Sequence, residues 1–371
     1  MINFSFFISV LFLITSEPIT NNKNEISSNA IKLISTEELN QKKNLILAAI
    51  SNYGWTDVAI FFKSYEMSNF ENCDFIIFAI NMTQTTLDKI KSCGIIIKPI
   101  PEKYIKIPIL SSRWKIYEEF LNDNPNKYNL VFTSDVRDTY FQRDLFKSYS
   151  NIKKPFLGIA IEDGFLSQEP QNKNWLINTY GANEFNKIKN GRIICAGTVW
   201  GSFDKFIEFS KIMKENLSTD WALRLNAVDQ AVANFLIYHD KVFNDCLIIS
   251  ENRDGPVMTI GLTNRALINI DENNNILNLK GEIVSVVHQY DRKADIVKLA
   301  INKYYPNLEK EIMSELLNKI IPFFIAIIFI ILFFVVLCYI CSYRSKNKLK
   351  MRKISSNKNE RKYKIYNFLL Q

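Results

Sequence analysis

The chain has 371 residues, of which 47% are hydrophobic and 13% aromatic, enough apolar material for one large domain or two modest ones. Its net charge of +8 comes from the C-terminal tail: ten Lys and Arg against one Glu after position 343 contribute +9, which leaves about −1 for the rest of the chain. With so small a net charge, the globular part shows no sign of the excess positive charge that nucleic-acid binding requires, and we expect no nucleic-acid partner.

An apolar stretch, residues 4–14, lies near the N-terminus and is followed by small and polar residues. It is too short to span a bilayer comfortably. We therefore expect a cleaved secretory signal peptide over residues 1–17, although no basic residue stands at its start. The main globular domain is expected to follow over residues 22–305.

A second apolar stretch, residues 320–341, contains no charge and is long enough to cross ~30 Å of hydrocarbon. We predict a juxtamembrane linker over residues 306–319, a transmembrane helix over 320–342 and a basic tail over 343–371. Pro322 falls near the first turn of that helix, where a missing N–H costs least. The positive-inside rule places the tail in the cytoplasm. We therefore expect a single-pass type I membrane protein with a luminal domain, in the ER, the Golgi or at the cell surface.

Two features of the predicted luminal part indicate covalent modification. Asn81 and Asn216 each begin a tripeptide of the N-glycosylation type, so we expect a glycoprotein, although such tripeptides also occur by chance. In an oxidising lumen one or two disulfides are expected, with Cys73 and Cys93 as the favoured pair. The spacing of the four cysteines before the span suits no zinc site: Cys73, Cys93, Cys195 and Cys246.

The first half of the luminal part alternates between strand and helix, as a parallel sheet requires. Apolar runs bounded by turn residues predict buried strands over 44–50, 74–80, 94–99 and 130–132, with a helix over 86–92. A further helix over 111–121 begins with a Ser cap and carries Trp114, Tyr117 and Leu121 at helical spacing.

Polar residues follow the first of these strands. Ser51, Asn52 and Tyr53 offer hydroxyl and amide groups and an aromatic face at the end of a buried strand. Such a set suits a nucleobase. A plain turn is an equally good interpretation.

Two carboxylates follow the strand at 130–132. Asp135 and Asp138 lie at the carboxyl end of a core strand, where open α/β sheets bind ligands. Their oxygens are hard ligands that suit Mg²⁺ or Mn²⁺, and such a cation would hold phosphate. Arg113, in the first turn of the preceding helix, would point toward the same crevice, where its fork matches diphosphate oxygens. The alternatives are turn formers and surface charges.

The second half contains a strand over 156–163 that ends in acids, a strand over 192–202 with two glycines, helices over 203–215 and 226–238, and a last element over 283–292 whose apolar strand ends at His288. Asp229 and Gln230 lie in the opening part of the helix at 226–238. Only two histidines occur in the chain. His239 follows a helix end among charged residues and is expected to be structural, whereas His288, at the end of an apolar strand, is placed to be a ligand.

Four stretches in this order resemble a GT-A-fold glycosyltransferase: SDVRD at 134–138, CAGTVWGS at 195–202, VDQAVANFLIY at 228–238 and VVHQYDRK at 286–293. The nearest resemblance is to largely uncharacterised eukaryotic nucleotide-diphospho-sugar transferase-like proteins. It covers residues 44–300 and not the membrane parts. It implies an α/β fold, a Rossmann-type mixed and mainly parallel sheet flanked by helices, which binds a nucleotide sugar.

The resemblance also implies a metal site and a reacting centre. Asp135 and Asp138 would be the DxD-type carboxylates that hold a divalent cation on the diphosphate, and His288 would be the third ligand, as in glycogenin-like relatives. Asp229 and Gln230, at the position of the family's DQ, would border the reacting centre.

The donor site implied by the resemblance draws on other segments. Ala196, Gly197 and Thr198 would face the donor sugar, with Gly197 allowing close approach. Arg113 or Arg292 would help the cation to neutralise the leaving diphosphate.

The chain departs from the family pattern in the spacing of its acids. Asp135 and Asp138 are three residues apart, with Arg137 between them. The pair can share a metal only if the chain turns tightly after Asp135. Arg137 would then orient a carboxylate or pair with phosphate.

We therefore expect a membrane-anchored, hexosyltransferase-like glycosyltransferase that uses Mn²⁺ or Mg²⁺ and moves a sugar from a UDP- or GDP-sugar donor to a glycan or protein acceptor. The alternative is a catalytically inactive relative that acts as a binding or adhesion module, since a signal peptide, a single span and a short basic tail fit a receptor equally well. A haloacid-dehalogenase-like phosphatase is disfavoured, because that family expects an Asp where Arg137 stands.

Overall fold

The computed structural model describes residues 42–217 and 228–369, with side chains described up to residue 352. The predicted signal peptide and the start of the predicted domain lie outside the described residues, as does Ser218 of the second glycosylation tripeptide.

The described residues form a mixed α/β fold around one large sheet. Its strands are β1 (Lys43–Ser51), β2 (Cys73–Ile80), β3 (Ile96–Pro99), β4 (Tyr128–Ser134), β5 (Thr139–Phe141), β6 (Leu157–Phe165), β7 (Arg192–Ser202), β8 (Leu247–Ser250), β9 (Val257–Thr259) and β12 (Val286–His288). The sheet order is β3-β2-β1-β4-β7-β6-β9-β12-β5, with β8 also paired to β6. A separate hairpin pairs β10 (Asn269–Ile270) with β11 (Ile276–Leu277).

Parallel pairing predominates in this sheet, as the sequence predicts. The exceptions in it are β7, which runs antiparallel to β4 and β6, and β5, which runs antiparallel to β12. The chain order reverses at β1, which lies between β2 and β4. Such a reversal opens a crevice at the carboxyl ends of the strands, where ligands of open α/β sheets bind.

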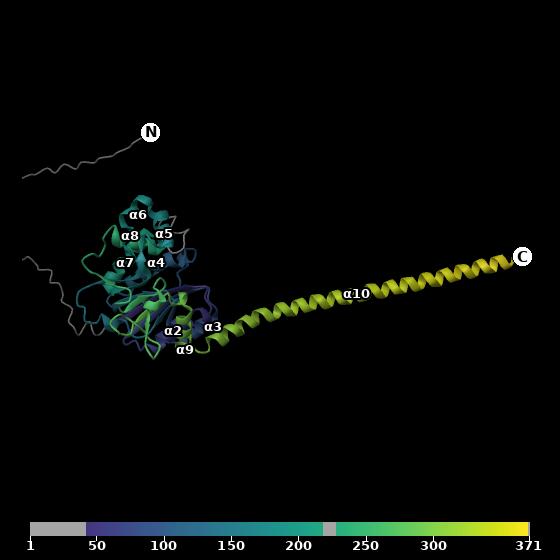
Figure 1. Ribbon diagram of the computed structural model, residues 1–371, viewed down its shortest axis with the longest axis horizontal. Helices are drawn as coiled ribbons and strands as arrows, with labels where there is room; N and C mark the ends of the chain where they lie inside the picture. The colour runs from purple at the N-terminus through teal and green to yellow at the C-terminus, as the bar shows by residue number, and fades with distance from the viewer. Residues whose placement is uncertain (1–41, 218–227, 370–371) are drawn as a thin grey trace, which may run out of the picture. The chain divides into compact units, whose positions relative to one another are not determined.

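Helices cover both faces of the sheet (Figure 1). Helices α2 and α9 pack on one face, and α4, α7 and α8 on the other, while α5 and α6 form a small cluster with α8. The bounds are α2 (Trp55–Met67), α3 (Gln84–Ser92), α4 (Ile109–Asn122), α5 (Pro170–Tyr180), α6 (Ala182–Ile188), α7 (Phe203–Asn216), α8 (Val228–Tyr238), α9 (Ala294–Tyr304) and α10 (Leu308–Leu369). Four short 3-10 turns complete the description: η1 (Glu102–Tyr104), η2 (Phe146–Ser148), η3 (Arg265–Leu267) and η4 (Tyr290–Arg292).

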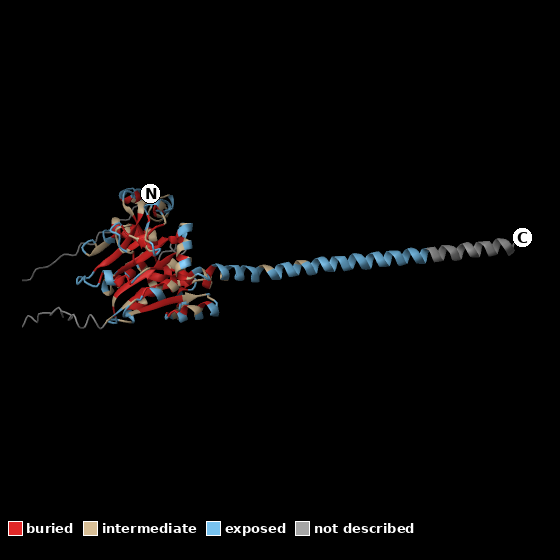
Figure 2. Ribbon diagram, turned by 60° about the horizontal axis from the view of Figure 1, so that its bottom comes forward, coloured by how far each residue is buried: buried red, intermediate tan, exposed pale blue. Residues whose placement is uncertain are grey.

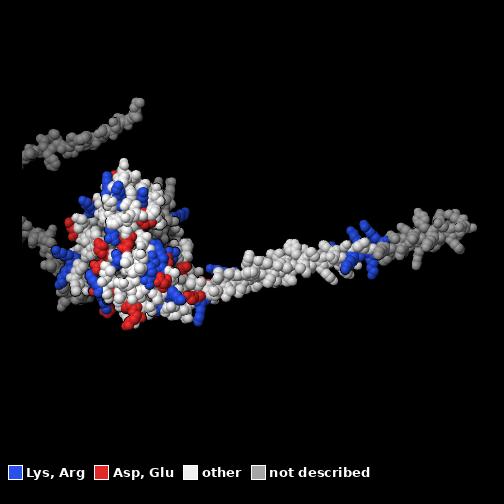
Figure 3. Space-filling model, in the orientation of Figure 1, with Lys and Arg blue, Asp and Glu red and all other residues white. Residues whose placement is uncertain are grey.

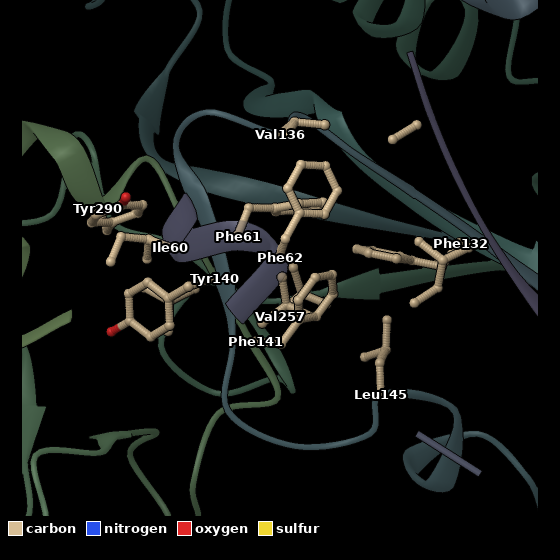
Figure 4. Packing of buried hydrophobic residues seen from close by; sticks show 14 of the residues in the cluster. Ile60, Phe61, Phe62, Phe132, Val136, Tyr140, Phe141, Leu145, Val257 and Tyr290 are labelled. Carbon is tan, nitrogen blue, oxygen red and sulfur yellow. The ribbon is translucent and has the colours of Figure 1, made fainter. Parts of the chain in front are cut away.

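Successive residues of the central strands pack into two different hydrophobic cores, one on each face of the sheet. Ile46 packs on the α2 side and Leu45 on the α4 side, because adjacent side chains of a strand point to opposite faces. Figure 2 shows the resulting buried interior. On the α2 side aromatic rings dominate, and Phe141 lies 5.1 Å from Phe61 and 6.1 Å from Phe132 between ring centroids (Figure 4). This packing fixes β4 and β5 against α2 on either side of Asp135 and Asp138.

Most predicted strands and helices are present, but one prediction about them is wrong. Helix α4 begins at Ile109 with Pro108 as its N-cap, and the predicted Ser cap is buried inside the helix. The last strand ends at His288 as predicted, where the chain takes a left-handed conformation at Gln289 and enters a 3-10 turn. No element was predicted for most of helix α2, which follows β1 directly.

The disulfide prediction is also wrong. All six cysteines are free thiols, including Cys73 and Cys93. Cys73 begins β2 and hydrogen-bonds the carbonyl of Asp74, while Cys93 caps the end of α3 and hydrogen-bonds the carbonyl of Lys89.

Helix α10 contains the predicted membrane span. Within Leu308–Arg352 it has one segment long and apolar enough to cross a membrane. Figure 3 shows the uncharged stretch of this helix followed by a group of Lys and Arg side chains. The predicted linker is mostly helical, since α10 already begins at Leu308.

Hydrogen bonds join the first turns of α10 to the helices that follow β1 and β2. The Trp55 indole N–H donates to the Tyr305 hydroxyl at 3.2 Å, and that hydroxyl donates to Glu311 at 2.6 Å. The Lys89 ammonium pairs with Glu311 at 2.9 Å. Helix α10 is therefore tied to the start of α2, just after the predicted nucleobase-binding turn.

Candidate active site

The turn after β4 brings the two predicted carboxylates to one place. Asp135 follows the last residue of β4, and its N–H donates to the carbonyl of Gly197 on the neighbouring β7 at 2.9 Å. Val136 is buried, and the chain then returns through Asp138 into β5. The tight turn on which metal sharing depends is therefore present.

His288 reaches the same place from β12, which is separated from β4 by three strands in the sheet order. It is paired antiparallel with Thr139, which directly follows Asp138. Its Nε2 lies 3.7 Å from Oδ2 of Asp135 and 3.5 Å from Oδ1 of Asp138. One ligand atom from each of the three residues lies within 4.8 Å of the others, so the three could hold a metal ion.

The imidazole of His288 is buried, and only one of its two nitrogens has a hydrogen-bond partner. Nδ1 lies 3.3 Å from the Cys195 thiol and 3.4 Å from the Thr259 hydroxyl. Nε2 is buried without any hydrogen-bond partner. A buried polar atom of this kind is costly unless it is satisfied, and a cation between the three side chains would satisfy it. The residues therefore fit a divalent metal.

Gly197 is required for this convergence. A Cβ at this position would lie 2.6 Å from Oδ2 of Asp135 and 2.6 Å from Cε1 of His288. The sequence predicted close approach of a donor sugar to Gly197. In the structure Gly197 gives room to two of the candidate metal ligands.

Arg113 is buried and bridges two acids. Its guanidinium lies 2.5 Å from Asp135 and 2.5 Å from Asp229, and it also donates to the carbonyl of Ala196 at 3.0 Å. Burial alone would raise the pKa of Asp135, but Arg113 and His288 beside it hold that pKa well below its usual range. For Asp229, burial outweighs Arg113 and the pKa is raised.

The pKa of His288 is raised, although burial lowers the pKa of a histidine that has no charged neighbours. Burial alone would lower its pKa, but the Cys195 thiol and the carboxylates of Asp138 and Asp135 raise it well above the ordinary value. Protons and a divalent cation therefore compete for the same negative site.

A cavity of about 190 Å³ lies over these residues, at the carboxyl ends of the strands. Of the residues predicted for the site, it is lined by Arg113, Asp135, Asp138, Ala196, Gly197, Asp229, Gln230, His288 and Arg292. Thr198 is fully buried opposite Ser134 and does not line it. His239, expected to be structural, lies apart from the cavity and pairs with Glu184.

Sequence reasoning missed a polar network on the floor of this cavity. The Gln230 amide donates to Glu162 at 3.2 Å and to Asn172 at 2.9 Å, and the Gln289 amide donates to Glu162 at 3.3 Å. Glu162 is buried, and burial raises its pKa although His288 and Arg292 oppose the shift. It ends an apolar strand run just as Asp135 does, so the same rule that found Asp135 could have found it.

The predicted nucleobase residues lie beside a second cavity of about 330 Å³. Ser51 and Asn52 line it, together with Asn81, Tyr104 and Ser112. Tyr53 does not line this cavity. Burial raises the pKa of its hydroxyl; Arg137 opposes this rise, and Asp135 and Asp138 add to it.

The two glycosylation candidates differ in their surroundings. Asn81 is exposed with a positive φ of 54°, and it lines the second cavity. Asn216 ends α7 and donates its amide to the carbonyl of Ile212 at 2.9 Å. A glycan on Asn81 would therefore stand at the cavity that Ser51 and Asn52 line.

Comparison with known proteins finds a match only among solved structures. No family model matches the chain, and no curated protein matches it. The chain is similar to an active-site mutant of LgtC, with 15% identity and a TM-score of 0.44, and to the galactosyltransferase LgtC in complex with donor and acceptor sugar analogues, with 13% identity and a TM-score of 0.42. Each alignment covers 69% of this chain and 95% of the other.

Substitution of Gly197 tests whether the three candidate ligands act together. We expect Gly197→Ala to lower Mn²⁺ affinity by roughly 10- to 100-fold, because the new methyl group must displace Asp135 or His288. Isothermal titration of the full chain in detergent measures this. Ala196→Gly, which removes a methyl group from the same strand, is the control. Unchanged Mn²⁺ affinity in a folded Gly197→Ala protein would show that the three residues hold no metal together.

The raised pKa of Glu162 predicts a pH-dependent stability. Its folded pKa lies above the unfolded value, so its contribution is full at low pH and is lost as pH rises through the folded pKa. Glu162→Gln, which stays neutral, should therefore raise the melting temperature at neutral pH. The gain should shrink toward zero at about pH 4, below the ordinary Glu pKa.

The measurement is thermal unfolding across this pH range in the presence of a chelator, which keeps any cation from changing the pKa of Glu162. Glu102→Gln, at an exposed position, serves as the control. A stability difference that does not vary with pH would contradict the raised pKa.

Proposed function

We propose that the chain is a metal-dependent glycosyltransferase that moves a sugar from a nucleoside diphosphate donor to a glycan or protein acceptor. The observation that carries this proposal is the convergence of Asp135, Asp138 and His288, with a buried nitrogen that lacks a partner, at the carboxyl end of the sheet. Three protein ligands leave coordination positions open for the oxygens of a diphosphate.

Mn²⁺ or Mg²⁺ would be held by the two carboxylates and the imidazole. When bound, the cation would neutralise the charge that builds on the leaving diphosphate. Thiolate ligands would favour a softer metal, but Cys195 faces Nδ1 of His288, on the other side of the ring from Asp135 and Asp138.

Of the two arginines predicted for the diphosphate, Arg292 suits that role better. It is exposed and lines the cavity. Arg113 already engages Asp135, Asp229 and a backbone carbonyl, so we assign it to positioning these acids. An arginine at the rim can follow a phosphate as it leaves, whereas a buried bridging arginine is fixed.

The donor would lie across the N-terminus of α4. Ile109 and Ser112 line the larger cavity, while Leu110 and Arg113 line the smaller one. Pro108, the N-cap, supplies no side-chain hydrogen bond to this end of the helix. Helix N-termini favour phosphates, so the diphosphate would cross here, with the base in the cavity of Ser51 and Asn52.

The sugar would then occupy the smaller cavity, near Asp229 and Gln230. The amides of Gln230 and Gln289 meet at Glu162, which gives the floor both donors and acceptors for hydroxyl groups. Asp229, paired with Arg113, would contact the sugar or stabilise positive charge as the bond to the leaving group breaks.

The anchor would place this domain on the luminal side of a membrane. α10 supplies the span, and the basic residues after it favour a cytoplasmic tail. The domain boundaries predicted from the sequence, 22–305 for the domain and 320–342 for the span, complete this proposal.

Nucleotide binding tests the proposed function. The full chain in detergent is titrated with UDP, GDP and their sugar conjugates, with and without Mn²⁺. We expect metal-dependent binding that Asp135→Asn plus Asp138→Asn weakens by ~100-fold, because the cation loses both its anionic ligands.

The control is a second double variant with the same chemical change at exposed sites, Asp88→Asn plus Asp123→Asn. It should bind as the wild type does. A folded wild-type protein that binds no nucleotide under any metal condition would overturn the transferase and leave a binding module as the better interpretation.

Glycosylation of Asn81 tests the position of the base. In protein whose Asn81 peptide is shown by mass to carry a glycan, we expect nucleotide affinity to rise at least several-fold in Asn81→Gln, because the glycan stands at the proposed base cavity. Asn216→Gln removes the other site and should change nothing. Equal affinities with and without the Asn81 glycan would place the base elsewhere.

A further inference from the structure

Two thiols lie together on α10, apart from the candidate active site. Cys338 and Cys341 are both free and exposed. They are three residues apart on a continuous helix, so their side chains lie on neighbouring turns of one face. Residues at this spacing can be reached by the same approaching molecule.

The pair lies where the apolar stretch ends. The charge-free run of 22 residues, 320–341, closes with Cys341, and Arg344 is the first charge after it. At ~1.5 Å per residue this run matches the thickness of the hydrocarbon, which puts Cys341 at the membrane surface and Cys338 about one turn inside it.

Basic side chains follow at once. Arg344, Lys346, Lys348, Lys350 and Arg352 follow the apolar run in the sequence, and Figure 3 shows a group of Lys and Arg side chains beyond the uncharged stretch of α10. They would attract anionic lipid headgroups and any phosphate-bearing molecule at that surface. A long-chain acyl-CoA has both parts that this location selects, an acyl chain for the bilayer and phosphates for the basic group.

We propose that Cys338 and Cys341 are S-acylated by a long-chain acyl-CoA. The sulfur of each cysteine attacks the carbonyl carbon of the acyl-CoA. A new sulfur–carbon bond forms as the bond from that carbon to the CoA sulfur breaks, and the cysteine proton ends on the CoA thiol. No oxidant or reductant is needed, since one thioester replaces another.

The added chains would adjust the span rather than attach the protein. One transmembrane helix already anchors the chain, so two further chains add little to its residence in the membrane. They would hold this end of α10 in its leaflet and resist changes of tilt, which affects sorting between membranes of different thickness. The modification depends on a cytoplasmic tail and not on the proposed transferase activity.

Thioester counting tests the proposal on the full chain expressed in eukaryotic cells. Free thiols are blocked, thioesters are cleaved with neutral hydroxylamine, and the thiols released are coupled to a polymer that retards the protein on a gel. We expect two hydroxylamine-dependent shifts in the wild type, one in Cys338→Ser or Cys341→Ser, and none in the double variant. The matched control, Cys73→Ser plus Cys246→Ser, alters two half-buried thiols of the globular domain and should keep both shifts.

Two results would overturn the proposal. One is the absence of any hydroxylamine-dependent shift in the wild type when another acylated membrane protein of the same cells shows its own. The other is a disulfide-linked dimer on a non-reducing gel that is lost in Cys338→Ser plus Cys341→Ser, since this would place the thiols in an oxidising compartment. Nucleotide binding by the same preparations reports on the transferase separately.

Discussion

The candidate site depends on Arg113, which lies buried between Asp135 and Asp229. The two carboxylates repel each other, and burial removes the hydration of Asp229; the shared guanidinium offsets both effects. It also divides the oxygens of Asp135: Oδ1 faces Arg113 at 2.5 Å, while Oδ2 faces His288 at 3.7 Å. One oxygen is fixed by a protein cation and the other remains for an added one. Loss of Arg113 would leave Asp229 buried without its cationic partner.

Strand pairing places Gly197, Asp138 and His288 around the ion pairs that Arg113 makes with Asp135 and Asp229. Because β7 runs antiparallel beside β4, the carbonyl of Gly197 receives the N–H of Asp135, and the absent side chain of Gly197 leaves room for His288. Because β5 returns antiparallel along β12, Asp138 precedes a residue that is paired with His288. Local turn geometry alone would not bring an imidazole 150 residues away onto two neighbouring acids. The register between β5 and β12 brings the imidazole to the acids.

The sequence predicted the elements of the site better than their contacts. Apolar runs ending in Asp135 or His288 are local signals: Asp135 directly follows β4, and His288 is the last residue of β12. Helix α2 was missed because it is buried along much of its length, so its apolar residues show no clear period. Arg113 was predicted to face the crevice and bind diphosphate, with a surface position as the alternative, and its pairing with two acids was missed because those partners lie 22 and 116 residues away. Glu162 carries the same local signal as Asp135, but its contacts with Gln230 and Gln289 come from distant segments.

The residues that line the two cavities differ in burial and hydrogen bonding, and this difference affects specificity. Around the smaller cavity Arg113, Asp229 and Glu162 are buried and bonded to one another or to neighbouring amides, so few changes are tolerated there without loss of a partner. The larger cavity is lined by Asn52 and Asn81, whose backbones both have positive φ and whose side chains belong to exposed turns. Loops on a rigid scaffold are where recognition varies. Under the proposed function, the reaction would depend on the buried residues of the smaller cavity, which tolerate few substitutions. The choice of nucleotide would depend on the exposed turns at the larger cavity, which tolerate more.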